Sequence, residues 1–337
     1  MSSLNHKAPT VVFAEMPEAV GRDISIEREQ LPPGTRIQRF AWGGDPDALV
    51  KSCLEADAVL TDYVPFNREV LMQLPALPLI SIAATGWDCV DTEAAAEMGV
   101  SVASVGEYCT DEVADHTLAL LLALNRCLRD YDSQVQLRRH WRWNEVRGIR
   151  PLKEQTLGLL GCGRIGMAVA RRARGFGLRV LAHDPVLDAA AAAEAGIALA
   201  TLDQVLRRSD IISLHCPLQP DTAGMLDADA FARMERRPML INVARGALIV
   251  EKDLIAALDT GRISAAALDV LAEESPDLGA HPLCGRRNVL LTPHVAFYSE
   301  TALANVRRIS ADNIRYFLEG RFDRVNRFVN LVDKKTP

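Results

Sequence analysis

Short apolar runs alternate with helical patterns along almost the whole chain. In the first third, four runs rich in β-branched residues have the length and composition of buried strands, and they span residues 10–14, 57–63, 78–84 and 99–104. Between them, residues 45–56 and 91–98 have the apolar spacing of helices and acidic residues in the first turn. This alternation predicts βαβ units and therefore parallel sheets.

A second series of the same kind begins at Thr156. Helical patterns again separate its expected strands, which span residues 156–161, 178–184, 210–216, 238–244, 262–270 and 288–294. Two longer helices are predicted outside the series. One, over 111–128, is apolar on most faces and should be buried, and the other runs from Ser299 to about Glu319, with Gly320 as its cap. Residues 129–152 are charged, have no clear period and are interpreted as an arm or linker.

The composition is that of a soluble globular protein. Of the 337 residues, 49% are hydrophobic and 24% are charged, and this length favours two domains over a single core. A net charge of -6 without a dense Lys/Arg block argues against non-specific binding of nucleic acid. The seven cysteines form no C-x-x-C pair and the seven histidines do not cluster, so we expect reduced thiols and no metal site.

The sequence also predicts a cytoplasmic location and no contact with membranes. The apolar run at 116–126 is too short to span a bilayer and ends in Asn125 and Arg126. The amino-terminal stretch MSSLNHKAPT is polar and lacks the apolar core of a signal peptide.

Residues 161–166, GCGRIG, form a glycine-rich turn between a predicted strand and a predicted helix. In this G-x-G-x-x-G pattern, the first glycine makes the tight turn, the second lets a pyrophosphate approach the backbone, and the third lets helix and strand pack closely. Asp184 ends the next strand, where a carboxylate can accept both adenosine ribose hydroxyls and would repel a 2′-phosphate. A purely structural turn is the alternative, but the flanking elements favour an NAD site.

Three ionisable residues follow separate strands of the second series. Arg245, in NVARGALIV, ends a strand that begins at Met239, and Glu274 and His294 follow the next two strands. Because the carboxyl ends of parallel strands meet at one edge, we expect these residues to converge. Arg245 can hold a carboxylate, His294 can protonate a carbonyl oxygen as hydride arrives at carbon, and Glu274 can fix the imidazole tautomer. Taken singly, each could instead be a solvated or structurally paired side chain.

Together these motifs resemble the D-isomer-specific 2-hydroxyacid dehydrogenase family from about Asp57 to Gly320. The similarity is carried by ATGWDCVD, DEVADHTLALLLALNR, GLLGCGRIGMAVARRARGFGLRVLAHDP, HCPLQPDT, INVARGALIV, AALDVLAEES and LTPHVAFYSE. The resemblance implies an NAD-dependent oxidoreductase that works mainly as a 2-keto acid reductase. Arg245, Glu274 and His294 fall on the family's catalytic residues.

The resemblance also implies the remaining contacts. The family's cofactor contacts fall on Thr85, Gly161, Gly163, Arg164, Ile165, Gly166, Asp184, Cys216, Pro217, Thr222, Val243, Ala244 and Asp269. Of these, Cys216, Pro217 and Thr222 would flank the adenosine, whereas Val243, Ala244 and Asp269 would meet the nicotinamide. Thr85 and Gly86 would hold the substrate carboxylate beside Arg245.

The implied fold class is α/β, with two Rossmann-like, doubly wound parallel-sheet domains and a cleft between them. Residues 1–106 plus 299–337 would form the discontinuous substrate domain, and 107–298 the NAD-binding domain. Members of the family usually dimerise through the NAD domain, using the arm that here contains Trp141 and Trp143. A homodimer is therefore expected, and packing of the two tryptophans on the chain's own helices is the alternative.

The branch of the family stays open. Residues 106–116 and 296–300 resemble C-terminal-binding proteins, which would make the chain an NAD(H)-sensing corepressor, although it has no long tail and no nuclear localisation signal. The loop IAATG at 82–86 instead resembles glyoxylate and hydroxypyruvate reductases. A phosphite-type dehydrogenase is a third interpretation, whereas Glu274 argues against a formate enzyme. Ile82 and Trp87 favour a pocket that does not suit small, highly polar acids.

Overall fold

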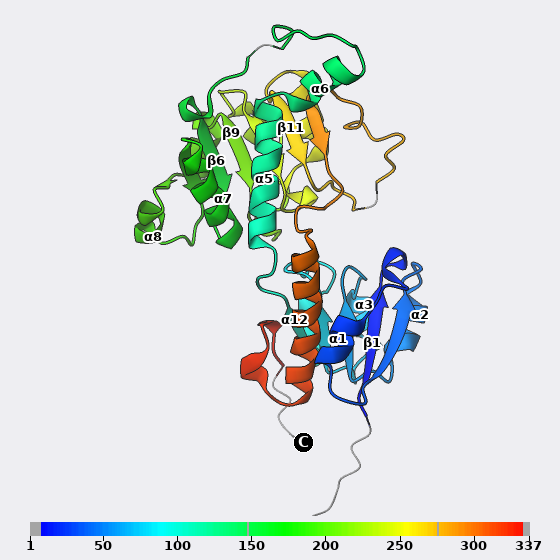
Figure 1. The fold of residues 1–337 in the computed structure, drawn as a ribbon. Coiled ribbons are helices and arrows are strands. Elements are labelled where there is room, and N and C mark those ends of the chain that lie inside the picture. Colours follow the sequence, from blue (N-terminus) through cyan, green and yellow to red (C-terminus); the bar gives the residue numbers. More distant parts are fainter. Residues whose placement is uncertain (1–7, 147, 275, 333–337) are drawn as a thin grey trace, which may run out of the picture. The chain divides into compact units, whose positions relative to one another are not determined.

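The computed structural model describes residues 8–146, 148–274 and 276–332, so most of the stretch on which the signal-peptide prediction rests lies outside the described residues. The chain divides into two compact units (Figure 1). The first unit contains Met1–Tyr108 and Ser299–Pro337, and the second contains Cys109–Tyr298. Each unit is built around one sheet.

The first unit has a six-stranded sheet in the order β13-β5-β4-β3-β1-β2. Five strands are parallel, and β13 pairs with β5 in the antiparallel direction. The sequence predicted four of these strands and missed β2 and β13, which lie at the two edges. The strands are β1 (Thr10–Glu15), β2 (Arg36–Ala41), β3 (Ala58–Thr61), β4 (Leu79–Ile82), β5 (Ser101–Ser104) and β13 (Arg327–Asn330).

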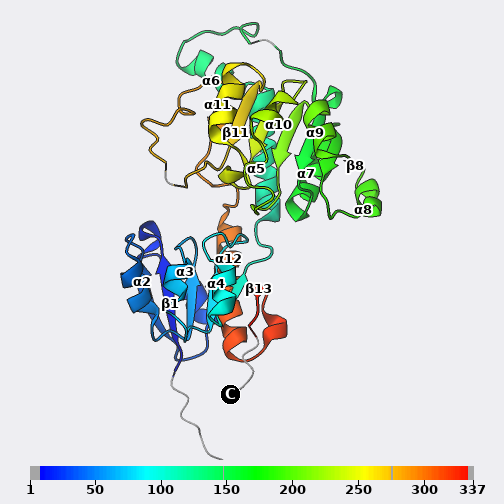
Figure 2. The same ribbon diagram turned by 180° about the vertical axis from the view of Figure 1, so that it is seen from behind.

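Helices cover both faces of this sheet, as Figures 1 and 2 show from opposite sides. One face carries α1 (Ser25–Gln30) and α12 (Glu300–Leu318). Two short 3-10 helices, η1 (Pro17–Ala19) and η4 (Phe322–Arg324), lie close to these helices in the sequence. The other carries α2 (Pro46–Cys53), α3 (Arg68–Leu71) and α4 (Thr92–Glu97).

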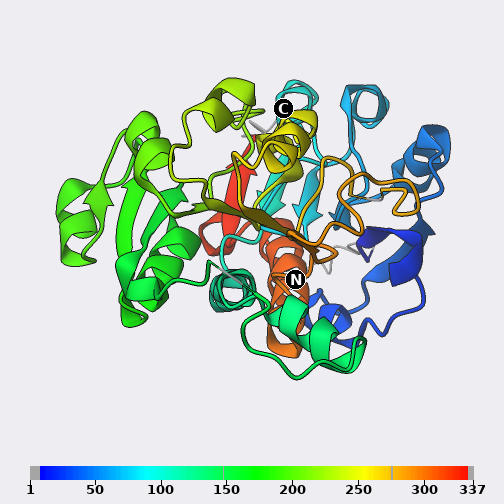
Figure 3. The ribbon, with the colours of Figure 1, turned by 90° about the horizontal axis from the view of Figure 1, so that it is seen from above.

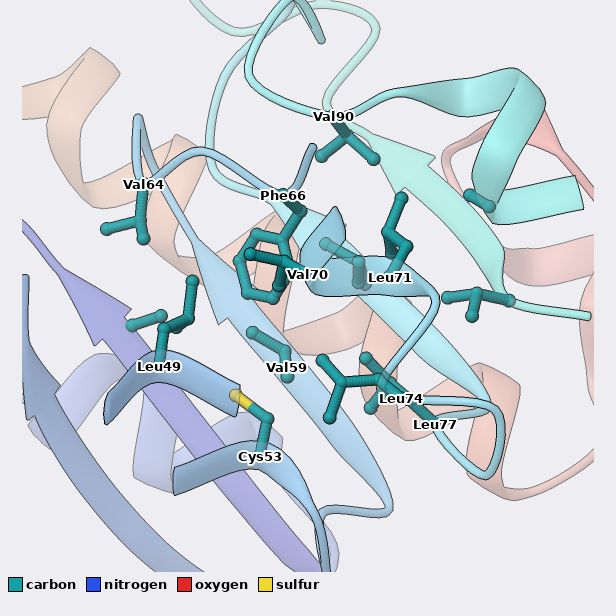
Figure 4. Close-up of a cluster of buried hydrophobic side chains, with 14 of the residues drawn as sticks. Leu49, Cys53, Val59, Val64, Phe66, Val70, Leu71, Leu74, Leu77 and Val90 are labelled. Carbon is teal, nitrogen blue, oxygen red and sulfur yellow. The ribbon is translucent and has the colours of Figure 1, made fainter. Parts of the chain in front are cut away.

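Residues of β1 alternate between the two apolar cores of the first unit, as the side-chain period of a strand requires. Val11 and Phe13 belong to the cluster that includes Ile314 of α12. Val12 belongs to the cluster around Phe66 that Figure 4 shows, with side chains from α2, α3 and the neighbouring loops. A strand buried on both faces explains why its sequence is continuously apolar.

The second unit has a seven-stranded, fully parallel sheet in the order β12-β11-β10-β9-β6-β7-β8. The strand order reverses between β6 and β9, and in open parallel sheets ligands bind at the carboxyl ends beside such a reversal. The strands are β6 (Thr156–Leu160), β7 (Arg179–His183), β8 (Ala198–Leu199), β9 (Ile211–Leu214), β10 (Met239–Asn242), β11 (Ala265–Leu268) and β12 (Val289–Leu291).

Two helical layers enclose this second sheet, and the view from above in Figure 3 shows strands between them. Helices α5 (Thr110–Asn125) and α7 (Arg164–Gly175) pack together on one face. The other face carries α9 (Leu202–Arg208), α10 (Ala228–Ala232) and α11 (Glu251–Asp259) (Figure 2). The remaining elements of the unit are α6 (Leu128–Gln136), α8 (Ala189–Glu194), η2 (Leu152–Glu154) and η3 (Gly246–Leu248). The α/β class with two parallel-sheet domains is thus confirmed.

The prediction of one helix over 111–128 is wrong at its end. Helix α5 ends at Asn125, Cys127 adopts a left-handed backbone with φ 51°, and α6 begins at Leu128. A left-handed residue interrupts the ladder of helical hydrogen bonds, so the chain turns and starts a second helix. The first part of the expected arm is therefore helical. No helix within the described ranges is long and apolar enough to cross a membrane.

Candidate functional site

The turn after β6 leads directly into α7. Gly161 has φ 87°, and a Cβ there would lie 2.5 Å from the backbone nitrogen of Cys216, so only glycine fits. Gly163 is the N-cap of α7, and no atom lies within 4 Å of the place where its Cβ would be. The first turn, Arg164–Gly166, has no acidic residue and the helix no side-chain cap. A helix start without a side-chain cap directs its backbone N–H groups toward an anion, which fits a pyrophosphate.

Asp184 follows β7, next to this turn. Its carboxylate accepts hydrogen bonds from the backbone amides of Cys162 at 2.7 Å, Val186 at 2.9 Å and Leu187 at 3.1 Å. A carboxylate has about four acceptor positions, so the amides fix its orientation and leave about one position for a further donor. A second ribose hydroxyl would find no acceptor position that an amide does not already use.

The loop after β9 faces Gly161 and contains the other residues predicted for the adenosine side. The Thr222 hydroxyl donates to the carbonyl of Pro217 at 2.7 Å and accepts from the amide of Gln219 at 2.8 Å, so this side chain orders the loop itself. Burial raises the pKa of the thiols of Cys162 and Cys216 to about 11. Both cysteines are therefore neutral, unreactive thiols at physiological pH.

Glu274 and His294 form a hydrogen-bonded pair. Nδ1 of His294 lies 2.7 Å from Oε2 of Glu274. The hydrogen bond from His294 holds the pKa of the Glu274 carboxyl below its usual range; partial burial opposes this effect, and the charges of His294 and Arg245 add to it. An ionised carboxylate can only accept, so the proton of this bond belongs to Nδ1 and Nε2 is left for other chemistry.

Arg245 lies three residues beyond the end of β10, in a turn that Asn242 holds. The fully buried side chain of Asn242 accepts from the amide of Ala244 at 3.0 Å and donates to the carbonyl of Arg245 at 2.8 Å. The next residue, Gly246, packs so tightly that a Cβ would lie 1.8 Å from the carbonyl oxygen of Leu271. This close approach joins the Arg245 turn to the segment that leads to Glu274. Arg245, Glu274 and His294 thus follow three adjacent strands, β10, β11 and β12.

Asp269, an expected nicotinamide contact, directly follows β11. Its side chain is fully buried and accepts from the Thr292 hydroxyl at 2.5 Å and from the amides of Val295 and Ala296, each at 2.9 Å. The other expected nicotinamide neighbours, Val243 and Ala244, belong to the turn before Arg245. In this structure Asp269 holds the segment that carries His294.

The first unit contains the loop predicted to hold the substrate carboxylate. Thr85 and Gly86 follow β4 and are half-buried. Ile82 is fully buried in the core, so its apolar character does not describe a substrate pocket. The Trp87 ring is half-buried and lies under the guanidinium of Arg327, 4.5 Å from the ring centre.

Sequence reasoning missed three polar residues that support the catalytic edge: Asn242, His116 and Thr292. Asn242 opens the NVARGALIV motif, where an Asx-type turn after a buried strand was a usable signal. Thr292 and His116 carry no such local signature, because their hydrogen bond joins residues that are 176 positions apart.

Comparison with known proteins points to one family. Residues 118–296 match the model described as D-isomer specific 2-hydroxyacid dehydrogenase, NAD binding domain. The chain is 36% identical over 308 residues to glycerate dehydrogenase of Methylorubrum extorquens, covering 89% of this chain and 94% of that protein. It is 34% identical over 308 residues to hydroxypyruvate reductase of Blautia hydrogenotrophica, covering 90% of this chain and 91% of that protein.

The chain is also similar to solved structures of 2-hydroxyacid dehydrogenases. The D-lactate dehydrogenase from Aquifex aeolicus, complexed with NAD and lactic acid, matches with a TM-score of 0.85 at 28% sequence identity. The match covers 95% of this chain and 98% of that chain, so it extends over both units.

Proposed function

The chain belongs to the D-isomer-specific 2-hydroxyacid dehydrogenase family, and we propose that it works mainly as an NADH-dependent reductase of short 2-keto acids. Family membership makes it an oxidoreductase that acts on CH–OH groups and contains the family's NAD-binding domain. The observation that carries the proposal is the 2.7 Å Glu274–His294 pair, which lies on the same sheet edge as Arg245.

Each of the three residues has one task in this proposal. Arg245 binds the substrate carboxylate through two parallel N–H···O bonds and orients the keto group. A dinucleotide held at the start of α7 and beside Asp184 would supply the hydride for the keto carbon. His294, with its proton on Nδ1 directed to Glu274, delivers a second proton from Nε2 to the carbonyl oxygen. Glu274 favours the imidazolium form because a carboxylate stabilises the adjacent positive charge.

The dinucleotide-binding residues favour NAD over NADP. The uncapped start of α7 suits the pyrophosphate, and Asp184 is held in place by three amides beside it. A 2′-phosphate would meet this fixed carboxylate, and juxtaposed like charges cost several kcal/mol. Thr85 and Gly86 are proposed to complete the grip on the substrate carboxylate.

The relatives support a short substrate. The proteins that match over most of their length include a glycerate dehydrogenase, a hydroxypyruvate reductase and a glyoxylate reductase. Because the Ile82 side chain lies in the core, it does not exclude small, polar acids from the substrate site. Hydroxypyruvate and glyoxylate are therefore the first candidates.

The test is NADH oxidation by the full chain with a panel of 2-keto acids. The panel runs from glyoxylate and hydroxypyruvate to phenylpyruvate and branched-chain acids, with NADPH in parallel and His294→Gln as the control variant. We expect turnover on the short acids and at least roughly tenfold preference for NADH. Preference for the bulky acids would overturn the substrate class, and preference for NADPH would overturn the role of Asp184.

Absence of turnover would favour a different function. If no acid is reduced while NADH still binds tightly, an NAD(H)-sensing corepressor-like protein becomes the better interpretation, and partner binding that depends on dinucleotide should then be measured. Reduction of NAD by phosphite would instead identify a phosphite-type dehydrogenase of the same family.

A further inference from the structure

The backbone of His294 is in an unusual conformation for its residue type. Its φ is 51°, in the left-handed region that residues with a Cβ seldom occupy. Such a conformation is strained and persists only where the surroundings impose it. Contacts from neighbouring residues must therefore hold the His294 backbone in this conformation.

Asp269 supplies direct contacts to this segment at four points. Its backbone carbonyl accepts from the His294 amide at 2.7 Å. Its buried carboxylate accepts from the Thr292 hydroxyl at 2.5 Å and from the amides of Val295 and Ala296. Donors on both sides of His294 thus converge on one residue at the end of β11.

His116 of α5 extends this arrangement. Its Nε2 lies 3.2 Å from the Thr292 hydroxyl oxygen and 3.6 Å from Oδ1 of Asp269. Because the Thr292 hydroxyl gives its proton to the carboxylate, its oxygen accepts from Nε2–H of His116. The direction of donation therefore runs from His116 through Thr292 to Asp269.

We propose that His116, Thr292 and Asp269 form a positioning unit, the His294 clamp, which imposes the left-handed backbone that directs the His294 ring toward Glu274. The clamp would act on the rate of reduction through His294, without contact to substrate. This task of Asp269 comes in addition to the nicotinamide contact that the family resemblance implies. The kinetic consequences of the clamp rest on the proposed reductase function, whereas its structural consequences do not.

The kinetic test uses Thr292→Val, which removes the hydroxyl and keeps the shape. A displacement of about 1 Å at a reacting group costs about 10²-fold in rate, so kcat should fall by roughly that factor while NADH binding changes less than about threefold. Thr292→Ser keeps the hydroxyl and should retain most of the activity. Thr117→Val is the matched control, because the buried Thr117 hydroxyl donates to the carbonyl of Val113 within α5.

A double-mutant cycle shows whether the clamp acts through His294. In a His294→Ala background, Thr292→Val should lower the residual rate by less than about threefold, since residues that act as a unit are not additive. An equal loss in both backgrounds would overturn the proposal. So would a Thr292→Val variant whose kcat stays within about threefold of wild type.

Hydrogen exchange provides the readout that does not depend on turnover. The amides of Val295 and Ala296 should lose protection in Thr292→Val and keep it in Thr117→Val. Unchanged protection in Thr292→Val would overturn the clamp even if the enzyme is active. If the wild-type chain reduces no keto acid, the proposed function fails while the exchange result still decides the clamp.

His116 is tested by paired substitutions. His116→Gln keeps an N–H donor near the position of Nε2 and should leave kcat within a few-fold, whereas His116→Leu removes the donor and should lower kcat by about tenfold. Equal kcat values for the two variants would exclude His116 from the clamp.

Discussion

Arg245, Glu274 and His294 influence one another through charge. The guanidinium of Arg245 and the ring of His294 both favour the ionised form of Glu274. In turn, the Glu274 carboxylate favours a protonated His294 ring, which the proposed reduction needs. The chemistry of this edge therefore depends on a set of charges rather than on any one side chain.

Substitution of Arg245 tests the grip on the carboxylate. Arg245→Ala should lower kcat/KM by on the order of 10³-fold, because a desolvated bidentate pair contributes several kcal/mol to binding of the transition state. Arg245→Lys keeps the charge but loses the planar fork, so it should recover only part of the rate. Steady-state kinetics on the best keto acid measures both, and a loss of less than tenfold in Arg245→Ala would contradict the assigned role.

The pH profile tests the Glu274–His294 pair. The proposed reduction requires a protonated His294, so the rate should fall toward alkaline pH. Glu274→Gln removes a charge-assisted hydrogen bond of about 1.5–3 kcal/mol, which should move this basic limb about 1–2 pH units lower. Because the hydrogen bond from His294 holds the pKa of Glu274 below its usual range, the wild-type pair should persist on acidification until the pH falls through that lowered pKa.

Profiles of kcat/KM from pH 5 to 9 measure this shift, and Glu273→Gln, one residue away, is the matched control. The Glu273→Gln variant should keep the basic limb of the pH profile where the wild type has it. A Glu274→Gln profile that coincides with wild type, or a wild-type rate that does not change between pH 6 and 9, would remove the acid role from His294.

At the scale of elements, the sequence indicated the central strands well and the edges poorly. Strands such as β1 and β9 are buried on both faces, so their apolar runs are continuous and easy to recognise. Edge strand β2, RIQRFA, alternates between exposed and half-buried residues and has no such run. The break between α5 and α6 depends on a left-handed Cys127, which its residue type does not signal.

Prediction of the site from the sequence has the same limit as prediction of the elements. The sequence could place Arg245, Glu274, His294 and Asp184 at one sheet edge because each lies in the segment after a parallel strand, and parallel strands end at one edge. The end of β10 at Asn242 could not, because side-chain bonds from Asn242 replace the expected strand pairing up to Arg245. The His294 clamp joins residues from α5, β11 and β12 that only the folded chain brings together.

At the scale of the whole molecule, the part of the arm that follows α6, residues 137–146 and 148–151, exposes two large aromatic side chains in a single copy of the chain. Trp141 is 89% exposed and Trp143 is 84% exposed, so neither packs on the chain's own helices. The backbone beside them is nevertheless held by α6. The Tyr131 hydroxyl donates to the carbonyl of Trp143 at 2.8 Å, and the side-chain amide of Gln134 donates to that of Arg142 at 2.6 Å.

A cavity of about 1040 Å³ lies between this arm and the amino-terminal edge of the second sheet. Its lining includes Glu145, Ile149 and Arg150 of the arm and the strand residues Met239, Ala265 and Val289. We propose that a second copy of the chain occupies this space and covers the tryptophans. Burial of one tryptophan removes about 150–250 Å² from water, which corresponds to about 4–6 kcal/mol at 25 cal/mol per Å².

The prediction is therefore a homodimer that depends on the arm. The combined Trp141→Ala and Trp143→Ala variant should weaken dimerisation at least about 10²-fold, since tryptophans at an interface commonly dominate its binding energy. Sedimentation velocity over a concentration series measures this directly. Phe176→Ala, which removes a 48% exposed aromatic side chain outside the arm, should leave the dimer intact. A wild-type chain that stays monomeric at high micromolar concentration, or a double variant as dimeric as wild type, would show that the arm serves another purpose.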